Sequence, residues 1–413
     1  MKKSINLVTA IAIVLLCCAL TFVITWCEFD KVSPVLTGYK AENAEMEQTI
    51  ARQEEKLDEV SKYFELKDII DTYYVGEYDQ QTLTDMMATG VVAGIGDKWS
   101  YYLSAEGYEE YLLSNANVYK GIGITITAEK KYNGFEIVKL AEIGPAREAG
   151  FLVGDVLIAV DGIDITGMAV DTVKNMVRGE DGTEVTITVV RNGAEMDLTA
   201  VRGTASYDIV RYELLEDNVG YVKIYNFEGN SAVKFIEAVE ELKAQGAEGF
   251  VFDVRNNPGG LMDQLLLIMD YILPEGDTFI QKSVSGQTVT YTSDEVCLDM
   301  PMTVLVNQNS YSAAEFFGAI VQEYEAGPVV GMKTTGKGYY QTPIRLSDGS
   351  AIVLSVGEYF TPSGKSLAET GVTPEYEIEV DNEQFALLYY DQLDYSKDEQ
   401  LIQAVHLTKT AID

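Results

Sequence analysis

The stretch Gly249-Phe250-Val251-Phe252-Asp253-Val254, which runs directly into Arg255-Asn256-Asn257-Pro258-Gly259-Gly260, decides the fold of the C-terminal half of the chain. Its first six residues are mostly apolar, as in a strand buried on both faces, and the Pro-Gly-Gly turn ends that strand. Leu261 to Tyr271 then follow with the apolar spacing of a helix. A buried strand that passes through a short turn into a helix is the repeating unit of an α/β sheet.

The same order of strand and helix occurs on both sides of this stretch. Because strands that alternate with helices pair in parallel, the pattern predicts an α/β (mixed α+β) layer with parallel strands. A late hairpin is expected beyond it, turning at Asp348-Gly349. The expected elements are a strand at Gly220–Ile224, a helix at Ala232–Ala244, a strand at Thr303–Asn307, a helix from Ser312 to about Glu323, and hairpin strands at Gln341–Leu346 and Ala351–Gly357.

Three turns in this half carry unusual residues where strands meet helices, which is where open α/β sheets place their chemistry. They are Arg255–Gly260, with two adjacent glycines; Ser310–Glu315, with Ser312 among small residues; and Gly336-Lys337-Gly338. Each has an ordinary explanation as well. Ser312 and Glu315 have the spacing of a helix capping box, Asn-Pro-Gly-Gly is a common turn, and a lysine between glycines is usually solvated.

A serine nucleophile needs a proton acceptor, and the chain offers few. Histidine, the usual acceptor, occurs once in 413 residues, at His406. Lys337 is therefore a candidate base for Ser312. The pKa of a lysine in water is about 10.4, but burial lowers that value by up to about 3 to 5 units.

Charge and cysteine content exclude several functions. Asp and Glu number 65 against 30 Lys and Arg, a formal net charge of −35 that disfavours nucleic-acid binding. Neither Cys-x-x-Cys pairs nor clustered histidines occur, so no metal or other cofactor is expected. The four cysteines are Cys17, Cys18, Cys27 and Cys297, which leaves a single thiol outside the N-terminal apolar region.

The N-terminal region predicts a membrane anchor over residues 1–30. Ser4 to Trp26 is a run of 23 residues without a charged side chain, long enough to cross a hydrocarbon core of about 30 Å. A cleaved signal peptide is the alternative, although its apolar region is usually shorter. Lys2 and Lys3 favour a cytoplasmic N-terminus, so the residues after Trp26 are expected outside the cell.

Residues 31–67 predict a helical stalk. Met46, Ile50, Gln53, Leu57, Val60 and Phe64 repeat at heptad spacing. Either a coiled coil that forms a homodimer or a single amphipathic helix on its own domain explains the stripe. Residues 68–115 continue with helical patterning and are expected to form a small helical subdomain.

A β-rich segment follows, expected at 116–203. Gly121 to Thr127 alternates like a strand, and Ala149-Gly150 with Gly154-Asp155 forms a compact motif. Together with the Asn192-Gly193 hairpin, this segment resembles a PDZ domain of the bacterial protease type. The resemblance implies that backbone N–H groups in the loop cradle the carboxylate of a peptide C-terminus, while the next strand pairs with the peptide. The residues expected to bind it are Gly121, Ile122, Gly123 and Ile124.

The whole set of motifs resembles the carboxyl-terminal processing peptidases, tail-specific serine proteases of family S41 with a PDZ domain. The similarity rests on Ser312, on Lys337 25 residues later, on Gln341, on the Arg255–Gly260 turn, and on the tail motifs Thr361-Pro362-Ser363-Gly364-Lys365 and Gly371-Val372-Thr373-Pro374. It implies a crotonase/ClpP-like α/β core at 204–380, followed by a tail at 381–413. Tyr311, Ala314, Thr335 and Glu375 depart from the family pattern.

The resemblance also implies a mechanism. A buried, neutral Lys337 takes the proton of Ser312, and the Gln341 amide fixes the direction of the lysine amine. The backbone N–H of Gly259 or Gly260, with that of Ala313, stabilises the oxyanion.

The expected function is therefore that of a single-pass membrane serine endopeptidase, with its catalytic region outside the cytoplasm and protein substrates that have apolar C-termini. Two other classes were compared with it. A non-catalytic PDZ scaffold would need neither Ser312 nor Lys337. A crotonase-like acyl-CoA enzyme would share the core, but it has no evident route to its substrate outside the cytoplasm.

Overall fold

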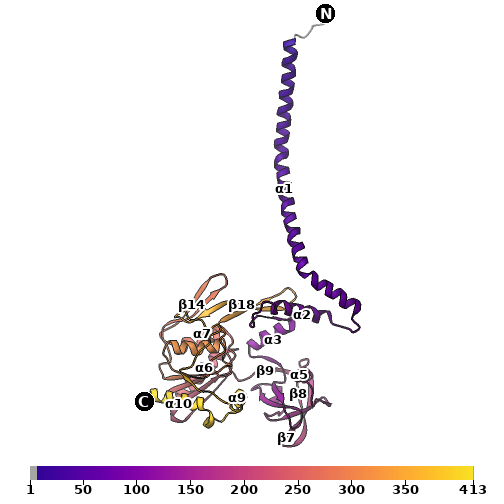
Figure 1. Cartoon of the computed structure of the whole chain (residues 1–413). Helices are drawn as coiled ribbons and strands as arrows, with labels where there is room; N and C mark the ends of the chain where they lie inside the picture. The colour runs from indigo at the N-terminus through magenta and orange to yellow at the C-terminus, as the bar shows by residue number, and fades with distance from the viewer. Residues whose placement is uncertain (1–6, 413) are drawn as a thin grey trace. The chain divides into compact units, whose positions relative to one another are not determined.

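The computed structural model describes residues 7–412, which divide into two compact units at Thr82 and Leu83. Figure 1 traces the chain from one terminus to the other. The prediction that rests on Lys2 and Lys3 lies outside the described residues.

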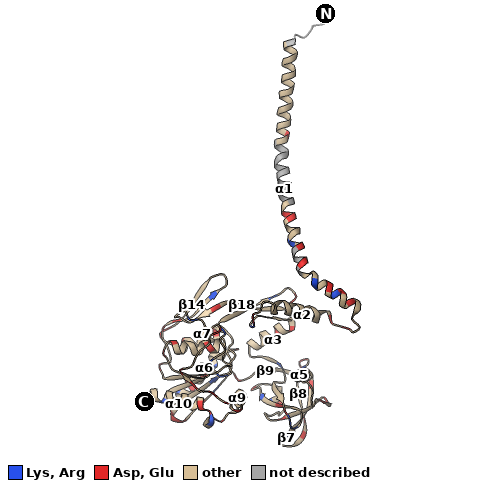
Figure 2. Cartoon of the chain, viewed as in Figure 1, with Lys and Arg blue, Asp and Glu red and all other residues tan. Residues whose placement is uncertain are grey.

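The first unit is dominated by one helix, α1 (Leu7–Tyr73), of 67 residues. It joins the predicted anchor and the predicted stalk without a break. Its segment Val8–Phe29, with a mean hydropathy of 2.7, is long and apolar enough to cross a membrane, a test that signal sequences also pass. Charged side chains gather in the C-terminal part of the helix (Figure 2).

The segment before the PDZ region differs in one respect from the predicted helical subdomain. Helices α2 (Gln80–Ala93) and α3 (Ala105–Asn115) are present, but a strand, β1 (Tyr101–Leu103), lies between them. It pairs antiparallel with β18 (Ala351–Phe360) of the C-terminal half. The reason is that Tyr-Tyr-Leu suits an extended, half-buried backbone, and its partner strand is 250 residues away, beyond the reach of local patterns.

The PDZ region folds as a separate β-domain with its own core. Its sheet has the order β3-β4-β5-β7-β8, and the buried residues Ile137, Leu157, Val173 and Ile187 pack together inside it. The short strands β2 and β9 pair where the chain enters and leaves. Its elements are β2 (Tyr119–Gly121), β3 (Ile124–Ala128), β4 (Phe135–Leu140), α4 (Pro145–Glu148), β5 (Val156–Val160), β6 (Ile163–Asp164), α5 (Val170–Val177), β7 (Glu184–Arg191), β8 (Ala194–Val201) and β9 (Gly203–Ala205).

The C-terminal half is built on a six-stranded sheet of order β10-β11-β12-β15-β16-β19. From β11 onward the neighbours pair in parallel, as the alternation of strands and helices predicts, and only β10 is antiparallel. The strands are β10 (Val210–Leu214), β11 (Val219–Ile224), β12 (Gly249–Asp253), β15 (Met302–Val306), β16 (Val329–Gly331) and β19 (Tyr376–Glu377).

Both faces of this sheet are covered, which explains why its strands are apolar throughout. Phe250 and Phe252 pack against α6 (Ser231–Gln245), α7 (Met262–Ile272) and α8 (Ala313–Glu323). Successive side chains of a strand point to opposite faces, so Val251 and Leu305 meet Leu401 and Ala404 of the C-terminal helix α10 (Glu399–Ile412) instead.

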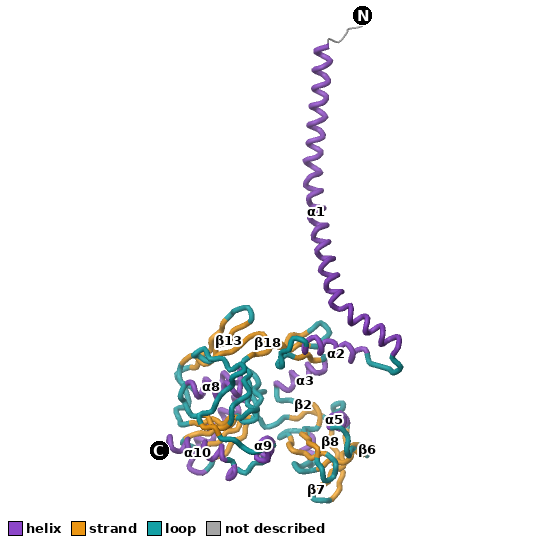
Figure 3. The backbone as a smooth tube through the Cα atoms, in the orientation of Figure 1, coloured by secondary structure: helices purple, strands orange, loops and turns teal. Residues whose placement is uncertain are grey.

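In a second sheet, β18 is the strand with the most partners. It pairs with β1, with β13 (Gly276–Ser283) and with β17 (Tyr339–Arg345). The β17–β18 pair confirms the predicted late hairpin, whereas β13 and its partner β14 (Thr288–Ser293) were not predicted. Figure 3 distinguishes strands, helices and loops along the chain. The remaining elements are the short helices η1 (Glu216–Asn218) and η2 (Tyr395–Lys397) and helix α9 (Asn382–Tyr389).

Candidate active site

Ser312 lies on a strained turn between the end of β15 and the first residue of α8. Its backbone angles are φ 59° and ψ −124°, outside the regions that a residue with a side chain ordinarily adopts. Such strain persists only where the surroundings enforce it, and it is common at catalytic nucleophiles. Here the Tyr311 N–H donates to the Asn257 carbonyl, and the buried Ser310 hydroxyl donates to the Val254 carbonyl at 2.7 Å.

Gly259 packs directly against this turn. A Cβ at Gly259 would lie 2.8 Å from the Ser312 Cβ and 3.0 Å from the Ala313 nitrogen, and the backbone there has φ +90°. Both facts require glycine at this position. The first glycine of the predicted pair therefore borders the predicted nucleophile, while Gly260 packs against the backbone of Phe227.

The two glycines differ in what their backbone N–H groups do. The Gly259 N–H donates to Asn257 Oδ1 at 2.8 Å, so in this conformation it is not free to bind an oxyanion. Among the described residues, neither the Gly260 nor the Ala313 N–H has a protein acceptor. Of the three N–H groups expected to bind the oxyanion, those of Gly260 and Ala313 are therefore unpaired in this conformation.

The buried Glu315 carboxylate joins the turn of Ser312 to the loop of Lys337. It accepts from the Ser312 N–H at 3.2 Å, from the Gly336 N–H at 2.5 Å and from the Lys337 N–H at 2.8 Å, and also from the Thr334 hydroxyl. Burial raises the pKa of Glu315, and these hydrogen bonds oppose that rise. The sequence identified Glu315 only as a capping residue.

Lys337 has the electrostatic character that a lysine base needs. Burial lowers its pKa to about 8, although the negative charges of Glu315 and Asp97 act in the opposite direction. A much larger fraction of Lys337 is neutral near pH 7 to 8 than of a lysine in water.

The amine of Lys337 does not bind Ser312 in this conformation. No hydrogen bond joins Lys337 Nζ to Ser312 Oγ, both of which are in the described part of the chain; Nζ lies 4.8 Å from the Trp99 ring centroid instead. The Ser312 side chain lies at the Tyr359 hydroxyl, which in turn donates to the Lys337 carbonyl. Catalytic hydrogen bonds are often long or poorly aligned before substrate binds, so this geometry is compatible with the predicted pair.

Gln341 lies on β17, and among the described residues no hydrogen bond joins its side chain to the lysine amine. Its Nε2 donates to the Tyr339 carbonyl at 3.0 Å and to Ser355 Oγ at 3.1 Å. The Ser355 N–H donates to Ser100 Oγ, and the Ser100 hydroxyl donates to Asp97 at 2.6 Å. Gln341 is therefore linked to the segment before β1, which the sequence did not connect with the site.

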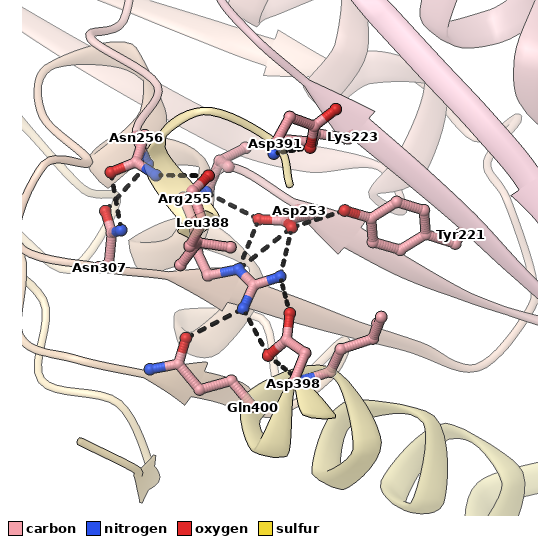
Figure 4. Close-up of polar contacts among 12 residues, drawn as sticks. Tyr221, Lys223, Asp253, Arg255, Asn256, Asn307, Leu388, Asp391, Asp398 and Gln400 are labelled. Carbon is pink, nitrogen blue, oxygen red and sulfur yellow. Dashed lines mark hydrogen bonds and ion pairs between the residues drawn. The ribbon is translucent and has the colours of Figure 1, made fainter. Parts of the chain in front are cut away.

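A buried ion network fixes the strand that leads to the glycine pair (Figure 4). The Arg255 side chain donates to Asp253 at 2.7 Å, to Asp398 at 2.9 Å and to Gln400 at 3.0 Å. The Tyr221 hydroxyl also donates to Asp253. Because Asp398 and Gln400 lie at the start of α10, the C-terminal helix holds the turn after β12 in place.

The predicted peptide loop of the PDZ domain has its own geometry. Gly121 and Gly123 have φ +128° and +81°, and a Cβ at Gly123 would lie 2.7 Å from that of Ala205, so both need glycine. In the described part of the chain the Ile122 and Gly123 N–H groups have no protein acceptor. The Ile122 side chain is buried in the domain core, and Ile124 begins β3.

A pocket of about 610 Å³ opens beside this loop. Two cationic side chains line it, and one of them, Arg178, pairs with Glu110 of α3 at 3.3 Å. The residues that line the pocket are Glu106, Glu110, Lys120, Gly121, Asn175, Arg178, Gly179, Glu180 and Asp181.

Comparison with known proteins places these features in a family. Residues 218–378 match the model of peptidase family S41, and residues 136–191 match a PDZ domain. A carboxyl-terminal-processing protease from Synechocystis is 30% identical over 299 residues, which are 70% of this chain and 69% of that protein. The chain belongs to peptidase family S41. This S41 chain is therefore a serine protease of the carboxy-terminal processing type, as the motifs predicted.

Other relatives of the S41 chain agree. The carboxy-terminal processing protease CtpA of Bacillus subtilis is 29% identical over 328 residues, which cover 79% of this chain and 69% of that protein. A solved structure described as an S41 protease from Bacteroides fragilis matches with a TM-score of 0.57 at 19% identity, over 82% of this chain and 93% of the other. That structure supports the fold.

The contact between Gly259 and Ser312 gives the first prediction. Gly259→Ala should lower kcat/KM about 10²-fold or more, because the added methyl group must displace the Ser312 turn. Peptide hydrolysis and thermal unfolding measure the two effects. Gly286→Ala is the matched control, since Gly286 has φ +85° with open space around it. Equal activity of the two variants would contradict the proposed role of this contact.

Proposed function

We propose that the chain is a serine endopeptidase in which Ser312 is the nucleophile and Lys337 is the base. The observation that carries the proposal is the shared carboxylate of Glu315, which binds the backbone of both residues. The lowered pKa of Lys337 supports the role of base, and the strained backbone of Ser312 supports the role of nucleophile.

The hydrolysis then proceeds in two steps. The neutral Lys337 amine turns toward Ser312 and takes its proton while Oγ attacks the substrate carbonyl. The N–H groups of Gly260 and Ala313 donate to the oxyanion, and the start of α8 adds the positive end of a helix dipole. The protonated lysine then gives its proton to the leaving amine, and water hydrolyses the acyl-enzyme by the same route.

Gln341 is proposed to act on the lysine only after that movement. In the resting conformation its amide nitrogen is held by Ser355 and Tyr339. Its amide oxygen is the atom that would accept a hydrogen bond from Nζ.

We further propose that the PDZ domain binds the C-termini of protein substrates. The N–H groups of Ile122 and Gly123 supply donors for a carboxylate, and the adjoining pocket has room for terminal residues. Lys120 and Arg178 line this pocket together with four acidic residues, so the proposal rests on the backbone N–H groups rather than on the charge of the pocket wall. The edge strand β3 is available to pair with an extended peptide, with apolar residues preferred.

Residues 1–30 are proposed to anchor the protease to the cell membrane with the catalytic region outside the cytoplasm. The apolar segment Val8–Phe29 supports this proposal, since its 22 residues match the thickness of a hydrocarbon core. A homodimer through residues 31–67 is proposed from the heptad spacing alone.

The dyad predicts the effect of two substitutions. Ser312→Ala and Lys337→Met should each lower hydrolysis of an unfolded protein substrate by about 10³-fold or more. Wild-type activity should rise with pH through about 8, because only the neutral form of Lys337 accepts a proton. The exposed Lys333→Met is the matched control. Retained hydrolysis by either active-site variant would refute the assignment.

The PDZ proposal predicts a preference for a free C-terminus. Two peptides of identical apolar sequence, one ending in a carboxylate and one in an amide, should bind the inactive Ser312→Ala chain with affinities that differ about tenfold or more, since hydrogen bonds to charged groups contribute about 1.5–3 kcal/mol. Fluorescence anisotropy measures both affinities. If the two peptides bind equally, the N–H groups of the loop do not read the carboxylate.

The anchor predicts how the chain fractionates. In cells that express the full chain, alkaline carbonate should leave it in the membrane pellet, and external protease should digest it in intact spheroplasts. Intact mass should include Val8–Phe29. A soluble chain that begins after this segment would show a signal peptide instead.

A further inference from the structure

The run Asp97-Lys98-Trp99-Ser100 forms a rigid turn between α2 and β1. The Asp97 carboxylate accepts from the Trp99 N–H at 3.0 Å and from the Ser100 hydroxyl at 2.6 Å. Ser100 in turn accepts from the Ser355 N–H of β18 at 3.0 Å. This hydrogen bond joins the turn to the second sheet, although the two bonded residues are 255 positions apart in the sequence.

The fixed turn places Trp99 beside the candidate base. Lys337 Nζ lies 4.8 Å from the Trp99 ring centroid and 5.8 Å from that of Tyr311. The two rings are 5.8 Å apart with an interplanar angle of 31°, and we call them the aromatic pair. Tyr311 precedes the candidate nucleophile, so the aromatic pair borders both reacting residues.

Two physical effects of the aromatic pair act on Lys337. The rings exclude water from the amine, which favours its neutral form, whereas the attraction between a cation and an aromatic face favours the ammonium. The other charged groups that act on the Lys337 amine are the carboxylates of Glu315 and Asp97. The Lys98 amine also lies over the Trp99 ring, 4.7 Å from its centroid. Burial lowers the pKa of Lys337 to about 8 against the opposing charges of Glu315 and Asp97.

The same contacts explain the resting position of the amine. A cation–π attraction holds only the charged form, because a neutral amine has no net charge for the ring to attract. Loss of the proton therefore weakens the contact with Trp99. The neutral amine, which alone can act as a base, is then the form that is free to turn toward Ser312.

We propose that Trp99 is a positioning residue for the reaction: with Tyr311 it shields the Lys337 amine from water and retains the ammonium form away from Ser312. This inference rests on the proposed function of Lys337 as base. It assigns a role in the protease site to residues before the PDZ domain, outside the 218–378 region that matches the S41 model.

The pH dependence of kcat/KM tests the proposal on the full chain in detergent. Trp99→Ala opens the amine to water, so the rise in kcat/KM should move from about pH 8 toward the ordinary pKa of lysine. A shift of one pH unit lowers the value at pH 7 by about tenfold, with recovery at higher pH. Trp99→Phe keeps a ring over the amine and should restore the wild-type profile.

Tyr102→Phe is the matched control. It removes the hydrogen bond from Tyr102 to Asp85 in the same segment but does not touch Lys337, so the profile should stay in place. If Trp99→Ala does not fold, as thermal unfolding would show, Tyr311→Ser removes the other ring and should move the profile in the same direction. Activity that falls equally at every pH would show a purely structural role and overturn the proposal.

Direct titration separates this inference from the proposed function. The Lys337 resonance of lysine-labelled Ser312→Ala chain, assigned by its loss in Lys337→Arg, should titrate at higher pH when Trp99→Ala is added. An unchanged titration overturns the role of Trp99 alone. Full hydrolysis by Lys337→Met would instead refute the lysine as base, whatever Trp99 does.

Discussion

The site depends on one buried carboxylate. Glu315 accepts hydrogen bonds from the backbone of Ser312, Gly336 and Lys337, and so sets the distance between two loops that follow different strands. A buried carboxylate is costly unless donors surround it, and these N–H groups satisfy it. The same bonds fix the strained turn of Ser312. The hydrogen bonds that offset the cost of burying Glu315 are thus the same bonds that position Ser312 and Lys337.

A second buried charge, that of Arg255, fixes the turn that carries Gly260, one of the proposed oxyanion donors. Arg255 is held between Asp253 of β12 and Asp398, which directly precedes α10 and accepts from the Leu401 N–H. The turn that begins with Arg255 ends at Gly260. Removing one partner of such a network leaves an uncompensated charge, which costs more than the network gains by forming. The C-terminal helix, which lies beyond the region that matches the S41 model, is therefore part of what positions the site.

Short stretches of the sequence were enough to predict the elements that depend only on neighbouring residues. The apolar runs of β12 and β15, the turn at Gly259-Gly260 and the start of α8 all follow from short stretches of sequence, and the structure contains them. Contacts between distant segments were not predictable in this way. Trp99 contacts Lys337, and β1 pairs with β18, but no periodicity in the sequence predicts these two contacts.

In this conformation, each residue of the proposed dyad contacts a group other than its proposed catalytic partner. Lys337 lies against Trp99, and the Ser312 side chain lies at Tyr359, while the Gly260 and Ala313 N–H groups have no protein acceptor in the described residues. In the proposed mechanism, a substrate carbonyl supplies the acceptor that these amides lack. Under that proposal, substrate binds at the oxyanion site before the lysine moves, and its binding promotes the alignment of the base.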